Sequence, residues 1–169
     1  DHDGIGDNTD INIDGDGFNN TKDAFPFDPT EWKDIDGDGV GDNSDDDIDG
    51  DGVANINDVF PTDKNETADM DGDGIGNNAD TDLDGDGIPN TTDDFPDNPN
   101  EWLDTDGDGV GDNADWDIDG DGIANAQDAF PYGDTEWLDT DGDGLGDGVD
   151  TDIDGDGIAN AADAFPEDA

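Results

Sequence analysis

Apolar residues stand at fixed places along this chain, and their places repeat with a period of 35 residues. The most regular of them directly follow an Asp-Gly pair: Ile5, Phe18, Val40, Val53, Ile75, Ile88, Val110, Ile123, Leu145 and Ile158. A strict internal period is the first property that decides a fold. It predicts a single array of repeats over 1–35, 36–70, 71–105, 106–140 and 141–169, the last incomplete.

The polar residues between these apolar ones form acidic loops. In residues 34–45, Asp occupies positions 1, 3, 5, 9 and 12 of a twelve-residue loop, Gly39 is at position 6 and Val40 is at position 7. This is the ligand spacing of an EF-hand-like calcium loop, in which position 7 ligates through its backbone carbonyl. A second such loop, 47–58, follows after Asp46 alone. Since no helix fits between them, we expect the two loops to stack directly.

We name the loops by their order within a repeat. The predicted ligands of the first-type loops, the earliest of which is truncated, are Asp1, Asp3, Ile5, Asp7 and Asp10; Asp34, Asp36, Asp38, Val40, Asp42 and Asp45; Asp69, Asp71, Asp73, Ile75, Asn77 and Asp80; Asp104, Asp106, Asp108, Val110, Asp112 and Asp115; and Asp139, Asp141, Asp143, Leu145, Asp147 and Asp150. Those of the second-type loops are Asn12, Asp14, Asp16, Phe18, Asn20 and Asp23; Asp47, Asp49, Asp51, Val53, Asn55 and Asp58; Asp82, Asp84, Asp86, Ile88, Asn90 and Asp93; Asp117, Asp119, Asp121, Ile123, Asn125 and Asp128; and Asp152, Asp154, Asp156, Ile158, Asn160 and Asp163. At Asn12 and Asn77 an amide oxygen replaces a carboxylate and can still ligate.

Clustered carboxylates with a backbone carbonyl favour Ca²⁺, which takes six to eight oxygen ligands in a flexible cage, whereas Mg²⁺ keeps more of its waters. The loops predict about ten ions. The formal net charge of -51, from 54 Asp and Glu against three Lys and Arg, requires bound cations for compaction. The same charge excludes nucleic acid and anionic membrane surfaces as partners.

Composition alone favours a different interpretation. With 28% apolar residues and 26 Gly, the chain resembles a disordered acidic polymer, and only the periodic placement of the acids argues against this. Cysteine is absent, and no apolar run reaches the length of a membrane span. No signal segment opens the chain. Because the chain begins within a motif, we expect it to be a segment of a longer polypeptide or a mature product.

Connectors follow the second-type loops. Each opens with Phe-Pro, at 25–26, 60–61, 95–96, 130–131 and 165–166, and three of them then carry Trp32, Trp102 or Trp137. We expect these residues to form small apolar cores between repeats, with carbohydrate binding by the Trp side chains as the alternative. The connector with Thr67 and Ala68 in place of Trp is predicted to be the weakest junction. His2 is expected to be exposed and not catalytic.

The paired loops Asp104–Asp115 and Asp117–Asp128 resemble the thrombospondin type 3 repeat, and the resemblance covers the whole chain. It implies acidic loops wrapped around many calcium ions with little regular secondary structure. The disulfides of the animal family are missing here, so its animal partners do not carry over. Cysteine-free repeats of this kind resemble those of bacterial and archaeal surface proteins, which implies a calcium-filled extracellular spacer. Dockerins, which need helices after each loop, and RTX repeats, with a nine-residue period, do not fit.

The sequence therefore predicts an elongated, calcium-rigidified rod, spacer or fibre segment at the cell surface or outside the cell. Its partners would be calcium, neighbouring copies of the chain or adjoining domains. The alternatives are a calcium-dependent adhesive module for a protein, polysaccharide or mineral surface, and a disordered calcium sink. An enzyme is not expected, because the carboxylate clusters are accounted for as ligand sets. Loops without helices and with Asp at position 12 should need millimolar extracellular calcium.

Overall fold

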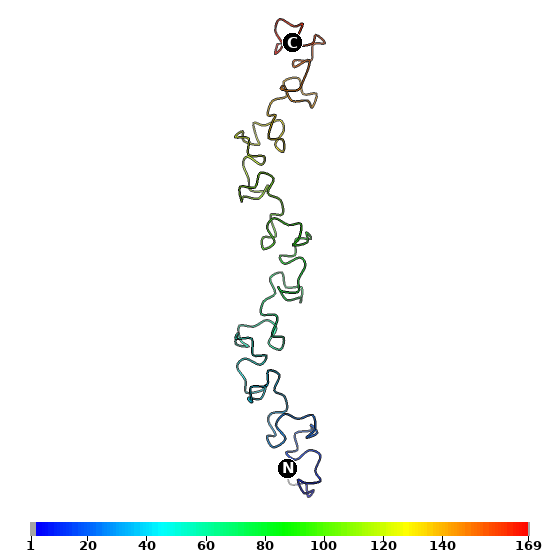
Figure 1. The fold of residues 1–169 in the computed structure, drawn as a ribbon, viewed down its shortest axis with the longest axis vertical. Helices are drawn as coiled ribbons and strands as arrows, with labels where there is room; N and C mark the ends of the chain where they lie inside the picture. The colour runs from blue at the N-terminus through cyan, green and yellow to red at the C-terminus, as the bar shows by residue number, and fades with distance from the viewer. Residues whose placement is uncertain (1–2, 169) are drawn as a thin grey trace. The chain divides into compact units, whose positions relative to one another are not determined.

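The computed structural model describes residues 3–168, and within that range the chain contains neither a helix nor a strand. It runs through successive turns and bends, which confirms the irregular secondary structure expected from the sequence (Figure 1). The chain divides into two compact units, Asp1–Leu83 and Asp84–Ala169. No helix long and apolar enough to cross a membrane occurs among the residues described.

Glycines at two places in each loop reverse the chain direction. In the loop 34–45, Gly37 at position 4 has φ 80° and Gly39 at position 6 has φ 94°. In the loop 47–58, the corresponding Gly50 and Gly52 have φ 70° and 97°. Glycine adopts positive φ without the steric cost that a side chain imposes. The glycine at position 6 was predicted from the ligand spacing, whereas the turn at position 4 was not. In the truncated first loop, position 4 is His2, which lies with the predicted ligand Asp1 outside the described residues.

The two loops of a repeat pack directly against each other, as predicted. A Cβ atom added to Gly50 would lie 2.6 Å from Asp36 Oδ2, and one added to Gly120 would lie 2.6 Å from Asp106 Oδ2. The glycine at position 4 of a second-type loop therefore lies against the Asp side chain at position 3 of the preceding first-type loop. This close approach, as well as the positive φ, requires glycine.

Acidic side chains occupy the interior of both units. Within the described range Ile118 is the one buried apolar side chain. The buried acids are Asp23, Glu31, Asp49, Asp58 and Glu66 in the first unit, and Asp84, Asp93, Glu101, Asp117, Asp119, Asp128 and Asp154 in the second. This reverses the usual distribution, in which Asp and Glu are almost never buried without a partner.

The expected apolar cores between repeats form only in part. Trp32 stacks on Phe18, with ring centroids 5.0 Å apart and planes 5° from parallel. By contrast, Trp102 and Trp137 remain 39% and 47% exposed, and Phe165 is 70% exposed. Each connector supplies too few apolar residues to enclose its aromatic side chains, so apolar packing cannot be what holds these units together.

Candidate metal centres

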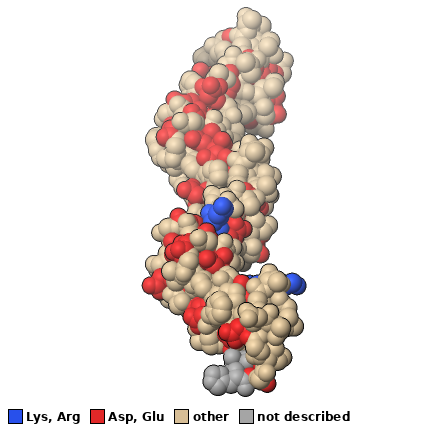
Figure 2. All heavy atoms as spheres, turned by 60° about the horizontal axis from the view of Figure 1, so that its bottom comes forward, with Lys and Arg blue, Asp and Glu red and all other residues tan. Residues whose placement is uncertain are grey.

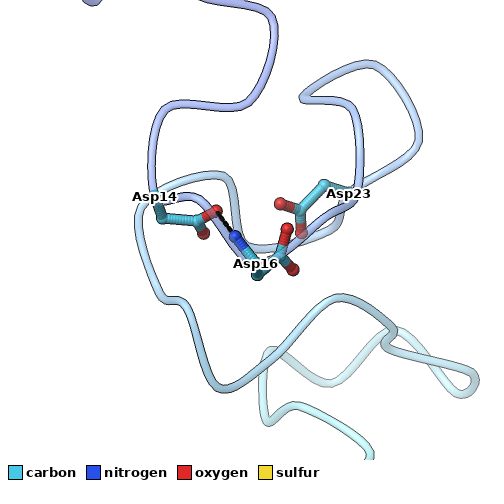
Figure 3. A group of neighbouring side chains, drawn as sticks. All are labelled: Asp14, Asp16 and Asp23. Atoms are coloured by element: carbon cyan, nitrogen blue, oxygen red, sulfur yellow. Dashed lines mark hydrogen bonds between the residues drawn. The ribbon is translucent and has the colours of Figure 1, made fainter. Parts of the chain in front are cut away.

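Carboxylates brought together by the glycine turns form recurring groups. One oxygen from each of the Asp residues at positions 1, 3 and 5 lies within 4.8 Å of the others in the loops beginning at Asp34, Asp47 and Asp69. In the loop 12–23, Asp14, Asp16 and Asp23, at positions 3, 5 and 12, form such a group. Figure 3 shows the carboxylates of Asp16 and Asp23 facing each other, with Asp14 beside them. Residues 82–93 span the boundary between the two units, and their role as ligands stays a prediction.

The carboxylates at positions 3, 5 and 12 of the loop 47–58 each use one oxygen to hold the backbone. In the loop 47–58, Asp49 Oδ1 accepts the amide of Asp51 at 3.3 Å, and Asp51 Oδ1 accepts the amide of Val53 at 2.6 Å. Asp58 Oδ1 accepts the amide of Phe60 at 2.8 Å. These local bonds fix each carboxylate relative to its own turn. They leave the second oxygen of positions 3, 5 and 12 to meet the other acids.

Second-type loops bury these second oxygens without a hydrogen-bond donor. In the loop 47–58, Asp47 Oδ1, Asp49 Oδ2, Asp51 Oδ2 and Asp58 Oδ2 are all buried and unpaired within the described protein. The corresponding oxygens in the second unit are Asp117 Oδ1, Asp121 Oδ2 and Asp128 Oδ2. Burying a charged group without a partner is costly, so buried charges are normally paired or coordinate a metal. An oxygen-only donor set of this kind fits a hard cation such as Ca²⁺.

Carbonyl groups at position 7 are also available to a cation. Among the described residues, the backbone carbonyls of Val40, Val53, Val110 and Ile123 accept no backbone hydrogen bond. The amide of the same residue is held by the position 5 carboxylate, as Val53 is by Asp51. This arrangement agrees with the predicted ligand role of position 7.

First-type loops are more open than second-type loops. Asp36 and Asp38 are exposed, and Asp34 accepts the amides of Gly37 and Gly39 with its two different oxygens, at 2.8 and 3.2 Å. In the second-type loop 47–58, Gly50 donates instead to the backbone carbonyl of Asp47 at 3.1 Å, which leaves one Asp47 oxygen unused. The two loop types therefore differ in how exposed a bound cation would be and in which carboxylate oxygens remain free to ligate it.

Desolvation and repulsion from the neighbouring acids raise the pKa of the position 3 carboxyl. Burial, together with the charges of Asp51, Asp58 and Asp47, raises the pKa of Asp49 above its ordinary value against the opposing hydrogen bond from Asp51. In first-type loops the hydrogen bond from the position 5 amide is the largest single effect and lowers the pKa, but desolvation and the charges at positions 5, 12 and 1 outweigh it. The position 3 residues whose pKa is raised in this way are Asp36, Asp71, Asp106 and Asp141. Within one loop, the carboxylates at positions 1, 3, 5 and 12 are thus close enough to influence one another.

Position 9 closes the loop on itself. Asn55 Oδ1 accepts the amide of Ile48 at 3.0 Å, while Asn55 Nδ2 donates to the carbonyl of Asp45 at 2.8 Å. In the first-type loop 104–115, both carboxylate oxygens of Asp112 are used by Thr105, which donates from its amide at 2.8 Å and from its hydroxyl at 2.7 Å. These bonds favour a role for the position 9 side chain in holding the loop closed, rather than the ligand role predicted from the spacing. The sequence carries a signal for this, because position 9 alternates between Asp and Asn whereas positions 3, 5 and 12 are always Asp.

Four connector glutamates, which were not among the predicted site residues, contact the first-type loops. Each accepts the backbone amide of the residue twelve places later, at 2.9 to 3.0 Å: Glu31 from Asn43, Glu66 from Asn78, Glu101 from Asn113 and Glu136 from Gly148. The available signal was their recurrence every 35 residues.

The fold and the acid groups together define a class of protein: a tandem array of cation-binding loops without regular secondary structure. The family model for the thrombospondin type 3 repeat matches residues 33–67, 68–102, 103–133 and 138–169, and the chain belongs to this family. A search of curated proteins found no match. Repeats of this family bind calcium and are structural rather than enzymatic, and they occur in extracellular proteins.

Proposed function

We propose that this chain is a calcium-rigidified structural region that serves as a rod, spacer or fibre segment outside the cell. The observation that supports this most strongly is the burial of unpaired carboxylate oxygens where other proteins have an apolar core. Such an interior is stable only with cations, so metal-binding free energy becomes folding free energy.

The ligand set of one site is clearest in the loop 47–58. Asp47, Asp49, Asp51 and Asp58 would hold Ca²⁺ together with the carbonyl of Val53. The ion supplies positive charge among carboxylates that otherwise repel one another. In the folded loop, the chain's own hydrogen bonds set the direction of these carboxylates, so that their remaining oxygens meet at one place.

An array of such sites would give a stiff, extended region. We expect two sites in each repeat and about ten in the chain. Each repeat contacts its neighbours in sequence, and this nearest-neighbour stabilisation is typical of solenoids, whose length grows with copy number. The open first-type loops support a requirement for extracellular calcium concentrations, because solvent-exposed ligands bind more weakly.

Small-angle X-ray scattering of the chain tests this proposal. In millimolar calcium we expect a thin, stiff particle, and after addition of a chelator a flexible coil with a larger spread of dimensions. The mass obtained in calcium separates a single rod from a fibre. An expanded coil under both conditions would replace the structural role with that of a disordered calcium sink.

Exposed aromatic side chains favour a second candidate, a calcium-dependent adhesive module. Trp116 is 65% exposed and Tyr132 is 69% exposed. Aromatic side chains are enriched at binding interfaces. Retention of the calcium-loaded chain on polysaccharide or mineral supports, lost in Trp116→Ala but kept in Trp32→Phe, would favour adhesion over a purely structural role.

A further inference from the structure

Three of the four connector glutamates are buried, and each of the four accepts a backbone amide of the following first-type loop. Glu31, Glu66 and Glu101 are 6% to 7% exposed. Glu31 uses both oxygens, accepting the amide of Asn43 at 3.0 Å and the hydroxyl of Ser44 at 2.5 Å. A carboxylate buried beside an acidic loop is tolerated only where donors reach it.

First-type loops carry a glycine that makes room for this glutamate. A Cβ atom added to Gly41, Gly76 or Gly111, at position 8, would overlap the side chain of Glu31, Glu66 or Glu101 respectively. Gly6 holds the same loop position without a preceding connector in the sequence, and a Cβ there would meet nothing within 4 Å. Second-type loops, which no connector glutamate contacts in this way, have Asn, Ala or Pro at position 8: Asn19, Ala54, Pro89, Ala124 and Ala159. In the loops that follow a connector, glycine at position 8 therefore occurs where the glutamate docks.

Docking of the glutamate depends on the same turn that completes the calcium loop. Asn113 donates to Glu101 at 2.9 Å from its amide, and its side chain donates to the carbonyl of Asn100 at 2.6 Å. Asn113 lies between Asp112, which clamps the loop, and Asp115, the position 12 acid. The turn itself is closed by bonds from the amides of residues 114 and 115 to Gly111. Closure of the loop and docking of the connector therefore involve the same turn.

We propose that Glu31, Glu66, Glu101 and Glu136 are positioning residues that couple calcium binding in each first-type loop to the order of the connector preceding it. They do not ligate the ion; they hold the turn at positions 8 to 12 in the closed form. Through this glutamate, calcium binding in a first-type loop orders the connector of the preceding repeat. Glu136 is the weakest of the four, because Gly148 has no side chain to bind the connector and Glu136 is less buried.

The test uses the full chain with a single tryptophan as local reporter. Trp102, next to Glu101, is retained while Trp32, Trp116 and Trp137 are changed to Phe, and its fluorescence is followed during calcium titration. We expect Glu101→Ala to raise the calcium midpoint by about tenfold, the lower end of what loss of an outer-shell partner costs in metal affinity. Glu101→Gln, which keeps an acceptor oxygen, should raise the midpoint less. A second reporter with only Trp137, beside the intact Glu136, should be unchanged.

A double-mutant cycle separates positioning from a general structural role. Gly111→Ala alone should raise the Trp102 midpoint, because its Cβ displaces Glu101, but should add nothing in the Glu101→Ala background. Gly6→Ala is the matched control and should have no effect. The inference would be overturned if the effects of Gly111→Ala and Glu101→Ala were additive. It would also be overturned if Glu101→Ala left the Trp102 midpoint unchanged, or shifted the Trp102 and Trp137 midpoints equally. So would loss of one bound calcium in Glu101→Gln, since the glutamate would then be a ligand.

This inference rests on the calcium-driven folding proposed above, and the two fail differently. If the parent chain shows no calcium response at either tryptophan, the proposed function itself is wrong. If the parent responds and the glutamate variants match it, only the coupling role is wrong.

Discussion

The Asp residues at positions 3, 5 and 12 have two tasks, one for each carboxylate oxygen. Oδ1 accepts a backbone amide two residues further on, and in the loop 47–58 Oδ2 is buried among the other acids, as at Asp49 and Asp58. An Asn side chain could accept the backbone amide at Oδ1, but it carries no negative charge to offer a cation. This agrees with positions 3, 5 and 12 being uniformly Asp, while position 9, whose side chain holds the loop closed, is often Asn.

Substitutions of Asp by Asn within one loop test this division of roles. In the loop 104–115, Asp108→Asn at position 5 should raise the calcium midpoint by about tenfold or more, an effect of at least about 1.4 kcal/mol. Asp112→Asn at position 9 should stay within about threefold, or about 0.7 kcal/mol, because Asn77 holds that position in the preceding first-type loop. Isothermal titration calorimetry measures both. Equal losses would make position 9 a ligand after all.

Proton competition follows from the raised pKa of the position 3 carboxyls, Asp36, Asp49, Asp71, Asp106 and Asp141. Between the ordinary and the raised pKa, the calcium-free folded loop binds more protons than the unfolded chain, so its stability falls as pH rises through that window. Calcium must displace those protons, and its affinity should therefore rise with pH over the same window. Calcium titrations at acidic and neutral pH measure this. A pH-independent midpoint would contradict the clustering of the acids.

At the scale of the loop, Asp119 joins a calcium loop to its connector. Its Oδ2 accepts the amide of Gly133 at 2.7 Å, fourteen residues later, and its Oδ1 accepts the amide of Asp121 at 3.2 Å. Asp119→Ala should abolish one calcium site and loosen the neighbouring connector. We expect one fewer bound calcium and faster proteolysis near residues 117–133. An unchanged calcium count with unchanged protease resistance would contradict the stacked-loop account.

The loops were predictable from sequence because their geometry is local. Ligand spacing, the glycine at position 6 and the direct packing of successive loops all depend on residues within about a dozen places of one another. The connector glutamates were missed because Glu31 contacts Asn43 from outside either loop. The predicted apolar cores are incomplete at Trp102 and Trp137, because a regular place in the sequence does not by itself bury a side chain. Position 9 fits the ligand spacing equally well as ligand or clamp, and only the hydrogen bonds of Asn55 and Asp112 separate the two roles.

At the scale of the molecule, the two units differ in their own supply of positive charge. Lys22, Lys33 and Lys64 are the three basic residues, and all belong to the first unit. Asp and Glu spread over the face of the molecule seen in Figure 2, where basic groups occupy only a few places. Neither unit can neutralise its acids internally, and the second has no Lys or Arg with which to begin. Cations from solution must therefore do what an apolar core does in other proteins.

Hydrogen exchange followed by mass spectrometry, with the chain in millimolar calcium and again in chelator, tests this central claim most directly. Loop amides that donate to carboxylates, such as those of Gly52 and Gly122, should be protected in calcium, and this protection should disappear in both units when calcium is removed. Restoring calcium should restore the protection. Loop amides that stay protected in chelator, or that exchange freely in calcium, would contradict an interior built from carboxylates and cations.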